Sequence, residues 1–388
     1  MLPDGIFLNF ADSMKIGFDA KRAFTNTSGL GNYSRFVVSG MMTFYPQDEY
    51  ALFTPKQKDL FKGFFPKVAK TQIIQPDGLG KRVSSLWRTF GLRSALVKHG
   101  VQVYHGLSNE LPYGLDTNQT KLVVTIHDLI FLRFPELYPT IDRYIYKKKF
   151  KAACDAAHQI VAISEQTALD LQEFFGVPQE KIKVVYQDCD PVFHLISGKE
   201  AQNAVQQKYQ LPSQYILCVG TLERRKNQLH LLKAWHAAGA QIPLAFIGRK
   251  TEYYKEMEAF ITQHHLQDKV LFLPYIPFQE LPIIYQLATL FVYPSVFEGF
   301  GIPIVEALNS GVPVITSTGS CFAEAGGVAS RYVSPTDVEA LSQAIQDVLA
   351  SAGLQKEMVK KGLEHAQTFR PEVTIPALHQ VYEQVLER

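Results

Sequence analysis

The sequence predicts an α/β protein built from two Rossmann-like, doubly wound parallel-sheet domains that face each other across a cleft. Its 388 residues suggest about two to three domains, at roughly 150 residues per domain. Short apolar, β-branched runs alternate with longer helical patterns along almost the whole chain, which is typical of βαβ units. The runs form two series, separated by a polar stretch at 188–210 that carries Pro191 and Gly198 and predicts a linker.

The first series predicts a first domain over residues 1–190. Its expected strands are 15–19, 101–105, 121–126, 159–163 and 183–186. Helical patterns lie between them, among them 32–44 and 143–157. Met14 directly precedes the first expected strand, so we interpret the residues before it as a peripheral extension or the product of a mis-set start.

The second series predicts a second domain over residues 191–370. Its expected strands are 215–219, 243–247, 270–273, 290–293 and 314–316. A parallel sheet needs helical crossovers between such strands, and helical patterns stand between them here too.

Composition excludes several classes of protein. Hydrophobic residues make up 46% of the chain and charged residues 20%, which supplies a core and excludes a disordered or fibrous chain. The net charge of +2 gives no argument for nucleic acid as a partner. The four cysteines stand far apart, which favours a reducing, cytoplasmic compartment. No uncharged stretch reaches the about 20 residues of a membrane span, and we expect no signal peptide.

Ligands of open parallel sheets bind beyond the carboxyl ends of the strands, so residues that follow strands are the functional candidates. Gly29 and Gly31 follow the first expected strand and open a helix, as a phosphate-binding loop does. Ser34 stands where a dinucleotide fingerprint has its third glycine, so we do not expect a NAD site. A flexible strand-to-helix turn is the alternative interpretation.

Two histidines end expected strands: His105, and His127 with Asp128 next to it. A histidine at such a rim can hydrogen-bond to a sugar hydroxyl, and a neighbouring carboxylate can hold its tautomer. Each histidine could instead satisfy loop backbone. We expect no metal site, because no companion histidine or cysteine stands at ligand spacing from either.

Arg225 and Lys226 follow the first strand of the second series, just before a helix that we expect to begin near Gln228. Basic side chains beside a helix N-terminus form a site for a diphosphate, because backbone N–H groups and fixed cations offset negative charge together. A solvated basic turn is the alternative.

The segment 293–308 gives the strongest local signal. Gly299 and Gly301 allow the backbone to turn after a strand, and Pro303 suits the first position of a helix. Glu298 then lies in the loop and Glu306 in the first helical turn. The loop amides of Gly299, Phe300, Gly301 and Ile302 are expected to face the same space as both carboxylates and to bind anionic or polyhydroxylated groups there.

These motifs together resemble the retaining glycosyltransferases of the GT-B fold, family 4, also called group 1 glycosyl transferases. Glu298 and Glu306 match that family's Glu-x7-Glu motif, and the 225–227 segment matches its donor-phosphate motif. The glycine segment 29–34, the turn after His127 and Ser164-Glu165 also resemble family positions. The likeness covers roughly residues 15–388.

The resemblance implies a role for each residue at the site. Glu306 would hold the nucleotide ribose, and Glu298 would approach the transferred sugar. Lys226 would neutralise the leaving diphosphate, with Arg225 as the second cation because Thr221 replaces an arginine common in relatives. His127 would contact the donor sugar near the reacting carbon, and Gly31 would bring backbone close to the phosphates.

The resemblance also implies a reaction and its partners. A hexosyl group would pass from a GDP- or UDP-hexose to a glycan or lipid-linked acceptor hydroxyl, with retention, without a metal and without a protein nucleophile. The setting would be cell-surface polysaccharide or glycan synthesis. The sequence leaves open the donor base, the sugar, the acceptor and the oligomeric state. A nucleotide-sugar epimerase of the same fold and a non-catalytic nucleotide-sugar-binding protein are the alternatives, and a glycosidase is a weaker one.

Two peripheral segments carry further expectations. Relatives end in a helix that crosses back onto the first domain, and Arg370-Pro371 breaks the chain before such a segment, so we assign 371–388 to the first domain. The segments 81–98 and 143–151 interleave basic and aromatic residues. They could dock on anionic lipid at the inner membrane face, although a solvated helix face explains them as well.

Overall fold

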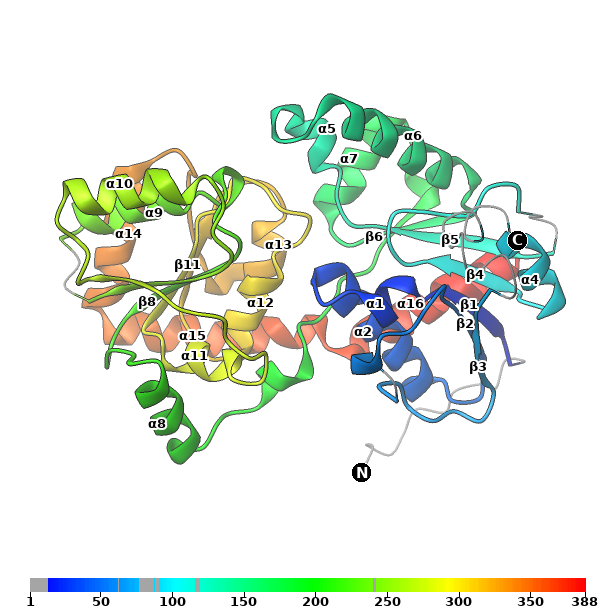
Figure 1. The fold of residues 1–388 in the computed structure, drawn as a ribbon, viewed down its shortest axis with the longest axis horizontal. Helices are drawn as coiled ribbons and strands as arrows, with labels where there is room; N and C mark the ends of the chain where they lie inside the picture. Colours follow the sequence, from blue (N-terminus) through cyan, green and yellow to red (C-terminus); the bar gives the residue numbers. More distant parts are fainter. Residues whose placement is uncertain (1–12, 62, 77–86, 88–90, 116–118, 240–241) are drawn as a thin grey trace.

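The structure is a computed structural model that describes residues 13–61, 63–76, 87, 91–115, 119–239 and 242–388. Its strands form a seven-stranded and a six-stranded sheet, and every recorded strand pair is parallel. Figure 1 shows two α/β bodies side by side, so the expected fold class is confirmed. The residues before Ser13 and half of the basic segment 81–98, namely 81–86 and 88–90, lie outside the described residues.

The first body contains the seven-stranded sheet, in the order β3-β2-β1-β4-β5-β6-β7. Its strands are β1 (Lys15–Asp19), β2 (Glu49–Phe53), β3 (Thr71–Ile74), β4 (Val103–Gly106), β5 (Lys121–Ile126), β6 (Gln159–Ala162) and β7 (Ile182–Val184). Its helices are α1 (Lys21–Thr25), α2 (Gly29–Phe44), α4 (Leu92–Lys98), α5 (Ile130–Arg133), α6 (Thr140–Ala156) and α7 (Glu165–Phe175). Strands β2 and β3 add to those that the sequence predicted.

The second body contains the six-stranded sheet, in the order β10-β9-β8-β11-β12-β13. Its strands are β8 (Ile216–Val219), β9 (Leu244–Ile247), β10 (Val270–Phe272), β11 (Leu290–Tyr293), β12 (Val314–Ser317) and β13 (Arg331–Val333). Its helices are α8 (Lys199–Lys208), α9 (Gln228–Ala237), α10 (Tyr254–Gln263), α11 (Leu281–Leu287), α12 (Ile302–Asn309), α13 (Phe322–Gly326), α14 (Val338–Ala350) and α15 (Ala352–Ala366). Helix α8 lies inside the expected linker and packs on α11.

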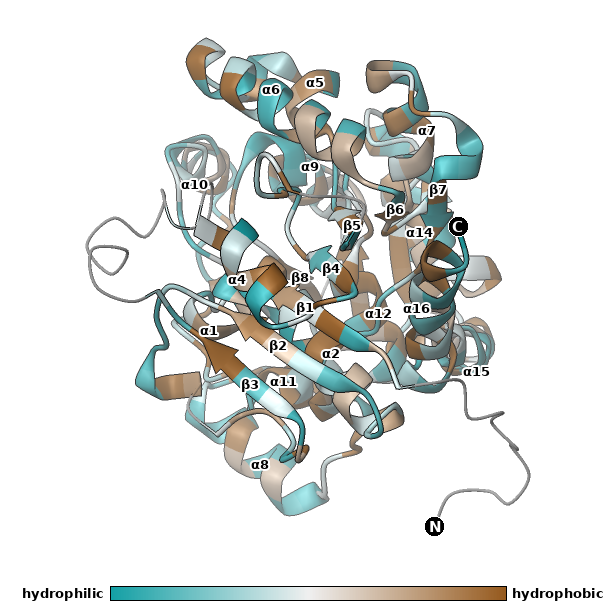
Figure 2. Ribbon diagram, turned by 90° about the vertical axis from the view of Figure 1, so that its right-hand side faces the viewer, coloured by the Kyte–Doolittle hydropathy of each residue, from teal (hydrophilic) through white to brown (hydrophobic). Residues whose placement is uncertain are grey.

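Both sheets are doubly wound, because chain order reverses direction within each. In the second body the reversal falls between β8 and β11, and in the first between β1 and β4. The loops that leave two such neighbouring strands diverge to opposite faces and open a crevice at the carboxyl edge. The strands themselves are largely buried apolar runs, as expected for a parallel sheet covered by helices on both faces; Figure 2 shows this hydrophobic character on β1 and β2.

The C-terminal helix α16 (Pro371–Leu386) leaves the second body and packs against α2 and β5 of the first (Figure 1). Ile375 of α16 sits so close to Gly40 of α2 that a Cβ on Gly40 would come within 2.4 Å of it. Tyr382 adds a buried hydrogen bond, since its hydroxyl lies 2.6 Å from Nδ1 of His105. The last helix of the chain is therefore part of the first body's core.

Candidate active site

The basic pair follows β8 at the reversal point of the second sheet. A short 3-10 turn, η7 (Arg224–Lys226), comes first, and α9 begins directly after Asn227. Asn227 has a left-handed backbone (φ 60°), and its side-chain amide donates to the carbonyls of Pro294 and Pro335. The first bond fastens the basic turn to the loop that leaves β11, and the second fastens it to the segment that follows β13.

Glu298 lies in the loop after β11 and meets both cations. Its Oε1 is 2.6 Å from Nζ of Lys226, and its Oε2 is 2.7 Å from Nη1 of Arg225. Ser295 and Tyr293 both donate hydrogen bonds to Oε1, at 2.5 and 3.0 Å. The structure thus brings together three residues that the sequence placed in two separate motifs.

The charge state of Glu298 follows from these contacts. Burial alone would raise the pKa of this carboxyl, but Lys226 and Arg225 outweigh burial and lower the pKa to about 2. Glu298 is therefore a carboxylate at neutral pH. A carboxylate held this firmly is a poor proton donor, which argues against its use as the general acid of a glycosidase.

Gly299 joins the second body to the first. A Cβ at this position would lie 2.3 Å from the carbonyl oxygen of His127, so only glycine allows the two loops to touch. The carbonyl of Gly299 accepts a hydrogen bond of 2.6 Å from the Ser164 hydroxyl at the start of α7. Glu298 and His127 consequently belong to one site, although they come from different bodies.

His127 is buried and its tautomer is fixed. Its Nε2 lies 2.9 Å from the carbonyl oxygen of Leu107; because a carbonyl only accepts, Nε2 carries the proton and Nδ1 carries a lone pair. Burial lowers the pKa of His127 to about 4, so the ring is neutral at neutral pH. The expected tautomer partner, Asp128, instead accepts a hydrogen bond from the amide of Ile130.

Glu306 lies on α12, in its second turn rather than the expected first. Its Oε2 accepts a hydrogen bond of 2.9 Å from the hydroxyl of Tyr285. Burial raises the pKa of Glu306 to about 7, and the Tyr285 hydrogen bond opposes that rise. The two glutamates of the motif are thus in opposite electrostatic settings. Glu298 lies between two cations, whereas Glu306 is buried with a neutral hydroxyl as its hydrogen-bond partner.

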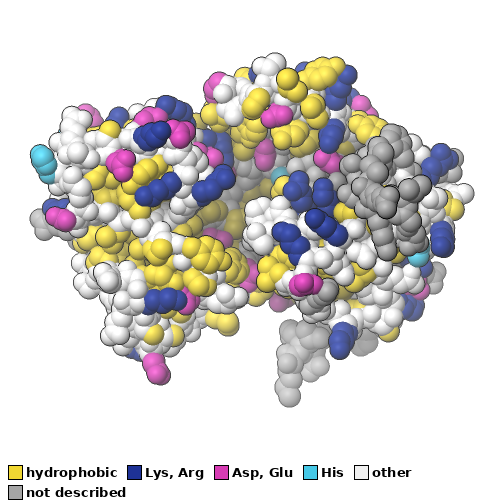
Figure 3. All heavy atoms as spheres, in the orientation of Figure 1, with side chains coloured by type: hydrophobic (Ala, Val, Ile, Leu, Met, Phe, Trp, Pro, Cys, Tyr) yellow, Lys and Arg dark blue, Asp and Glu magenta, His cyan; other side chains and the backbone are white. Residues whose placement is uncertain are grey.

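A cavity of about 310 Å³ opens between the two bodies beside Glu306. Residues from both bodies line it, including Gly29 and Tyr33 of α2 and Ile302 and Glu306 of α12. Figure 3 shows the surface hollowed between the bodies. A pocket at such a junction is the usual place for a small-molecule substrate.

Several sequence-based expectations need correction. Gly29 and Gly31 lie in the first turn of α2, after the short helix α1, and not in a loop directly after a strand. Gly31 has a local reason to be glycine, because a Cβ there would come within 2.0 Å of the carbonyl oxygen of Asn26. The Phe300 side chain packs against Tyr186 and Phe369; this does not affect the expectation for Phe300, which concerned its backbone amide.

His105 also lies away from the rim. It is buried, and its two ring nitrogens contact Tyr382 and Thr125. Of the two expected histidines, only His127 adjoins the site.

Sequence reasoning missed several residues of the site. Tyr293 ends the expected strand that precedes Glu298, and Ser295 follows it, so the rule that selected Glu298 also pointed to this edge. Tyr285 gave no signal, because it lies in a different helix, 21 positions before Glu306.

The geometry defines a class of protein: two Rossmann-like bodies with a basic pair at the reversal point of one sheet and a shared cavity are the architecture of GT-B glycosyltransferases. Residues 199–365 match the family model "Glycosyl transferases group 1", and residues 47–191 match "Glycosyltransferase Family 4". The chain therefore belongs to glycosyltransferase family 4, the group 1 glycosyl transferases, and it is a glycosyltransferase.

Two relatives and one solved structure are similar to the chain. The chain is 32% identical over 273 residues to the O-antigen chain mannosyltransferase B of Escherichia coli, covering 69% of this chain and 70% of that one. It is 29% identical over 231 residues to the O-antigen chain mannosyltransferase RfbU of Salmonella typhimurium, covering 60% and 61%. The crystal structure of Anabaena HepE in complex with UDP and glucose shares the fold, with a TM-score of 0.71, 18% identity and coverage of 96% and 100%.

Proposed function

We propose that this glycosyltransferase moves a hexosyl group from a nucleotide-diphosphate sugar to an acceptor hydroxyl with retention of anomeric configuration. The observation that carries the proposal is the convergence of Arg225, Lys226 and Glu298 at the reversal point of the second sheet. Glu306, with its neighbouring cavity, and the neutral ring of His127 complete the arrangement.

The donor diphosphate would bind to Lys226 and Arg225. Both cations are about 15% exposed and share one carboxylate, so a diphosphate can take over part of Glu298's role as their anionic partner. The amides of Gly299, Phe300, Gly301 and Ile302 stand at the N-terminus of α12, where the helix dipole favours an anion. Each well-placed donor would contribute about 3 to 4 kcal/mol to the stabilisation of charge on the leaving group.

The other residues would orient the donor. Glu306 as a carboxylate can accept hydrogen bonds from two ribose hydroxyls, and it faces the cavity between the bodies. The neutral ring of His127 can accept a hydrogen bond at Nδ1 from a hydroxyl group of the transferred sugar. Gly29 and Gly31, at the N-terminus of α2, would let the first body approach the phosphates.

We propose a front-face route for the reaction, without a covalent glycosyl-enzyme intermediate. The carboxylate of Glu298 is tied to two cations and accepts from Ser295 and Tyr293, which lowers its nucleophilicity. The departing diphosphate would accept the proton of the acceptor hydroxyl, while Lys226 and Arg225 offset its charge. We expect this step to need no added divalent metal.

The relatives suggest the substrate class. Two O-antigen mannosyltransferases are 32% and 29% identical to the chain, and HepE, which shares the fold, was crystallised with UDP and glucose. We propose a GDP- or UDP-hexose as the donor and a glycan or lipid-linked acceptor in cell-surface polysaccharide synthesis. Among the hexoses, we propose mannose as the first to test.

The first body also offers a surface for a lipid-linked acceptor. Helix α6 exposes Ile141 and Tyr144, at 74% and 60% exposure, beside exposed lysines such as Lys147 and Lys148. Apolar and basic side chains together are typical of a helix that rests on anionic lipid. No helix among the described residues is long and apolar enough to cross a membrane. We propose that α6 makes peripheral contact with the membrane.

The test is the stereochemistry of the product. Purified protein is incubated with UDP- and GDP-hexoses and a synthetic glycan acceptor, and the anomeric proton of the product is followed by NMR. We expect the product to carry the donor's anomeric configuration, with turnover unchanged by added Mg²⁺. Lys226→Ala should lower the rate, whereas Lys233→Ala, an exposed lysine on α9, should not. Inversion, or a covalent adduct at Glu298, would overturn the mechanism.

A further inference from the structure

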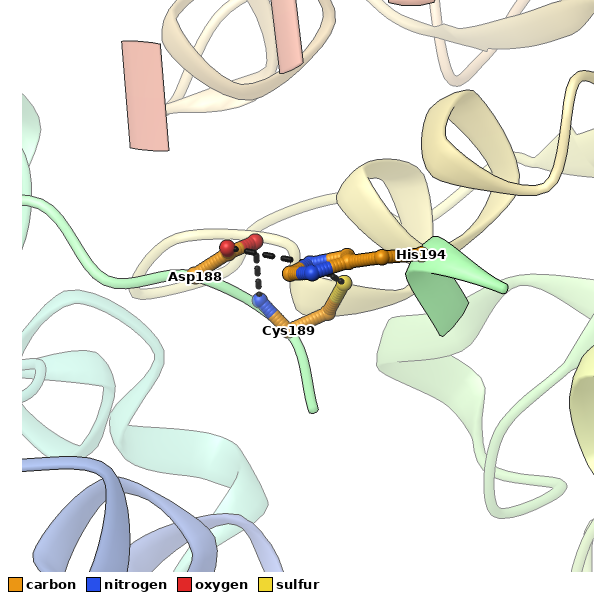
Figure 4. A group of neighbouring side chains, drawn as sticks. All are labelled: Asp188, Cys189 and His194. Carbon is orange, nitrogen blue, oxygen red and sulfur yellow. Dashed lines mark hydrogen bonds and ion pairs between the residues drawn. The ribbon is translucent and has the colours of Figure 1, made fainter. Parts of the chain in front are cut away.

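Three side chains of different chemistry meet in the segment that joins the two bodies. Asp188 and Cys189 follow β7 and are buried, and His194 ends the 3-10 helix η6 (Pro191–His194). Nε2 of His194 lies 3.1 Å from Oδ2 of Asp188 and 3.8 Å from Sγ of Cys189. Figure 4 shows the three side chains turned toward one another.

These two distances are close to the edges of a coordination tetrahedron. Zinc–nitrogen and zinc–oxygen bonds of about 2.0 to 2.1 Å and a zinc–sulfur bond of about 2.3 Å place tetrahedral ligand atoms about 3.3 to 3.6 Å apart. One potential ligand atom from each of the three residues lies within 4.8 Å of the others. Among the described residues, no other group of three such side chains is this compact.

One carboxylate oxygen of Asp188 lacks a hydrogen bond. Its Oδ1 accepts from the amide of Cys189 at 2.8 Å, which orients the carboxyl group. Its Oδ2 is buried and accepts no hydrogen bond, although Nε2 of His194 is only 3.1 Å away. A buried carboxylate oxygen that accepts no hydrogen bond is costly, and a cation placed between this oxygen and the ring nitrogen would satisfy both atoms.

The surroundings supply an entry path and a supporting contact. Asp188 and Cys189 line the same interdomain cavity of about 310 Å³ that adjoins Glu306, so solvent can reach the group from that side. The side-chain amide of Asn309 donates to Sγ of Cys189 at 3.3 Å. An N–H donor stabilises a metal-bound thiolate, as the outer partners of metal sites do.

We propose that Asp188, Cys189 and His194 form a binding site for a divalent cation of the zinc type. One oxygen, one sulfur and one nitrogen donor suit zinc better than magnesium or calcium, which prefer oxygen alone. A water from the cavity would take the fourth position. Binding replaces the S–H bond of Cys189 with a sulfur–zinc bond, and the thiol proton passes to solvent.

The site would act on the joint between the bodies rather than on the glycosyl transfer. Cys189 and His194 bracket the start of the linker, and η6 packs against α12, the helix that carries Glu306. A cation would therefore fix the linker to the wall of the donor cavity. Lys226, Arg225 and Glu298 take no part in it.

Zinc binding to the full-length chain tests the proposal. Chelator-treated protein is titrated with Zn²⁺ in a calorimeter, in two buffers with different ionisation enthalpies, and bound zinc is counted by elemental analysis. We expect about one zinc per chain, the release of about one proton and a higher melting temperature. Co²⁺ in place of Zn²⁺ should give a thiolate-to-cobalt charge-transfer band.

Variants assign the site. Cys189→Ser and His194→Asn should each weaken zinc binding by about 100-fold or more, since even the loss of an outer partner costs about 10- to 100-fold. Cys154→Ala, at another buried free cysteine, and His264→Asn, which removes a ring that lies 4.5 Å from His236, should bind zinc normally. Circular dichroism of the zinc-free variants confirms that they are folded. The proposal is overturned if the wild type binds no zinc, or if folded Cys189→Ser binds it as tightly.

Discussion

Arg225 and Lys226 share one carboxylate, and that sharing decides what Glu298 can do. Held by two cations and two hydroxyl donors, Glu298 stays ionised and keeps both cationic heads directed at the reversal point. The cations are thereby preorganised before a donor arrives, which is how charge stabilisation becomes effective in catalysis.

At the same scale, Glu306 makes donor affinity depend on pH. Its carboxyl must be ionised to accept from ribose hydroxyls, and burial raises its pKa to about 7. Affinity should therefore rise about tenfold from pH 6 to pH 8 and level off above. The measurement is the Kd of a nucleotide sugar by calorimetry, because a free nucleoside diphosphate has a terminal phosphate that itself titrates near pH 6.

Tyr285→Phe provides the matched variant for Glu306. The Tyr285 hydrogen bond stabilises the carboxylate, so its loss should move the midpoint of the affinity curve to higher pH. A Kd that does not change between pH 6 and pH 8 would contradict the ribose role of Glu306.

Sequence reasoning found the charged residues of the site because their types and their positions after strands are read directly. It could not find how they combine. The ion pairs of Glu298 join positions more than seventy residues apart, and the partner that fixes the tautomer of His127 is a backbone carbonyl, which carries no side-chain signal. His105 shows the converse error, since a position near the end of a strand does not reveal whether the side chain faces the rim or the core.

At the scale of elements, α7 of the first body is capped by a residue of the second. The carboxylate of Glu324 on α13 accepts hydrogen bonds from the amides of Glu165 and Gln166, at 2.6 and 3.1 Å. These amides begin α7 and would otherwise lack partners. The contact holds the two bodies in the arrangement that brings Gly299 against His127.

Glu324→Ala should loosen that arrangement. We expect the free energy of unfolding to fall by about 1.5 to 3 kcal/mol, the range for hydrogen bonds to a charged group, and the radius of gyration measured by X-ray scattering to increase. Glu339→Ala is the control, since Glu339 is an exposed acid in the first turn of α14. Equal behaviour of the two variants would show that the contact does not hold the bodies together.

Helix α6 gives a second prediction at this scale. If it rests on anionic lipid, Lys147→Ala with Lys148→Ala should weaken binding to phosphatidylserine vesicles by roughly 10- to 30-fold, at about 1 kcal/mol per lysine. Binding of the wild type should fall with added salt. The double change of Lys356 and Lys360 to alanine on α15, where both are exposed, is the control. Salt-independent binding, or none, would remove the membrane contact.

At the scale of the whole molecule, alternation of strand and helix was enough to predict two parallel-sheet bodies, because each βαβ unit repeats the same pattern. Three strands were not predicted. The edge strands β3 and β13 are short, at four and three residues, and mostly not buried, so neither shows the apolar run that marks an inner strand. Strand β2 is apolar, but its five residues are ambiguous on their own.

Because α16 packs against the first body, its apolar face should contribute to the free energy of unfolding of the whole chain. Ile375→Ala removes a fully buried side chain against α2 and should lower the free energy of unfolding by about 2 to 5 kcal/mol. Val373→Ala, on the same helix but 53% exposed, should change it by at most about 0.5 kcal/mol. Deleting 371–388 should lower the melting temperature further; an unchanged melting temperature in the truncated protein would refute the role of α16.

The central claim is that the reversal point of the second sheet binds a nucleotide-diphosphate sugar. The most direct measurement is a thermal-shift series with UDP, GDP, ADP, dTDP and their sugar conjugates, with and without Mg²⁺, on the wild type, Lys226→Ala, Glu306→Ala and the control Lys233→Ala. We predict that at least one nucleotide raises the melting temperature of the wild type and of Lys233→Ala through linkage, and that both site variants lose the shift. A shift that survives in both site variants, or no shift with any nucleotide, would contradict the claim.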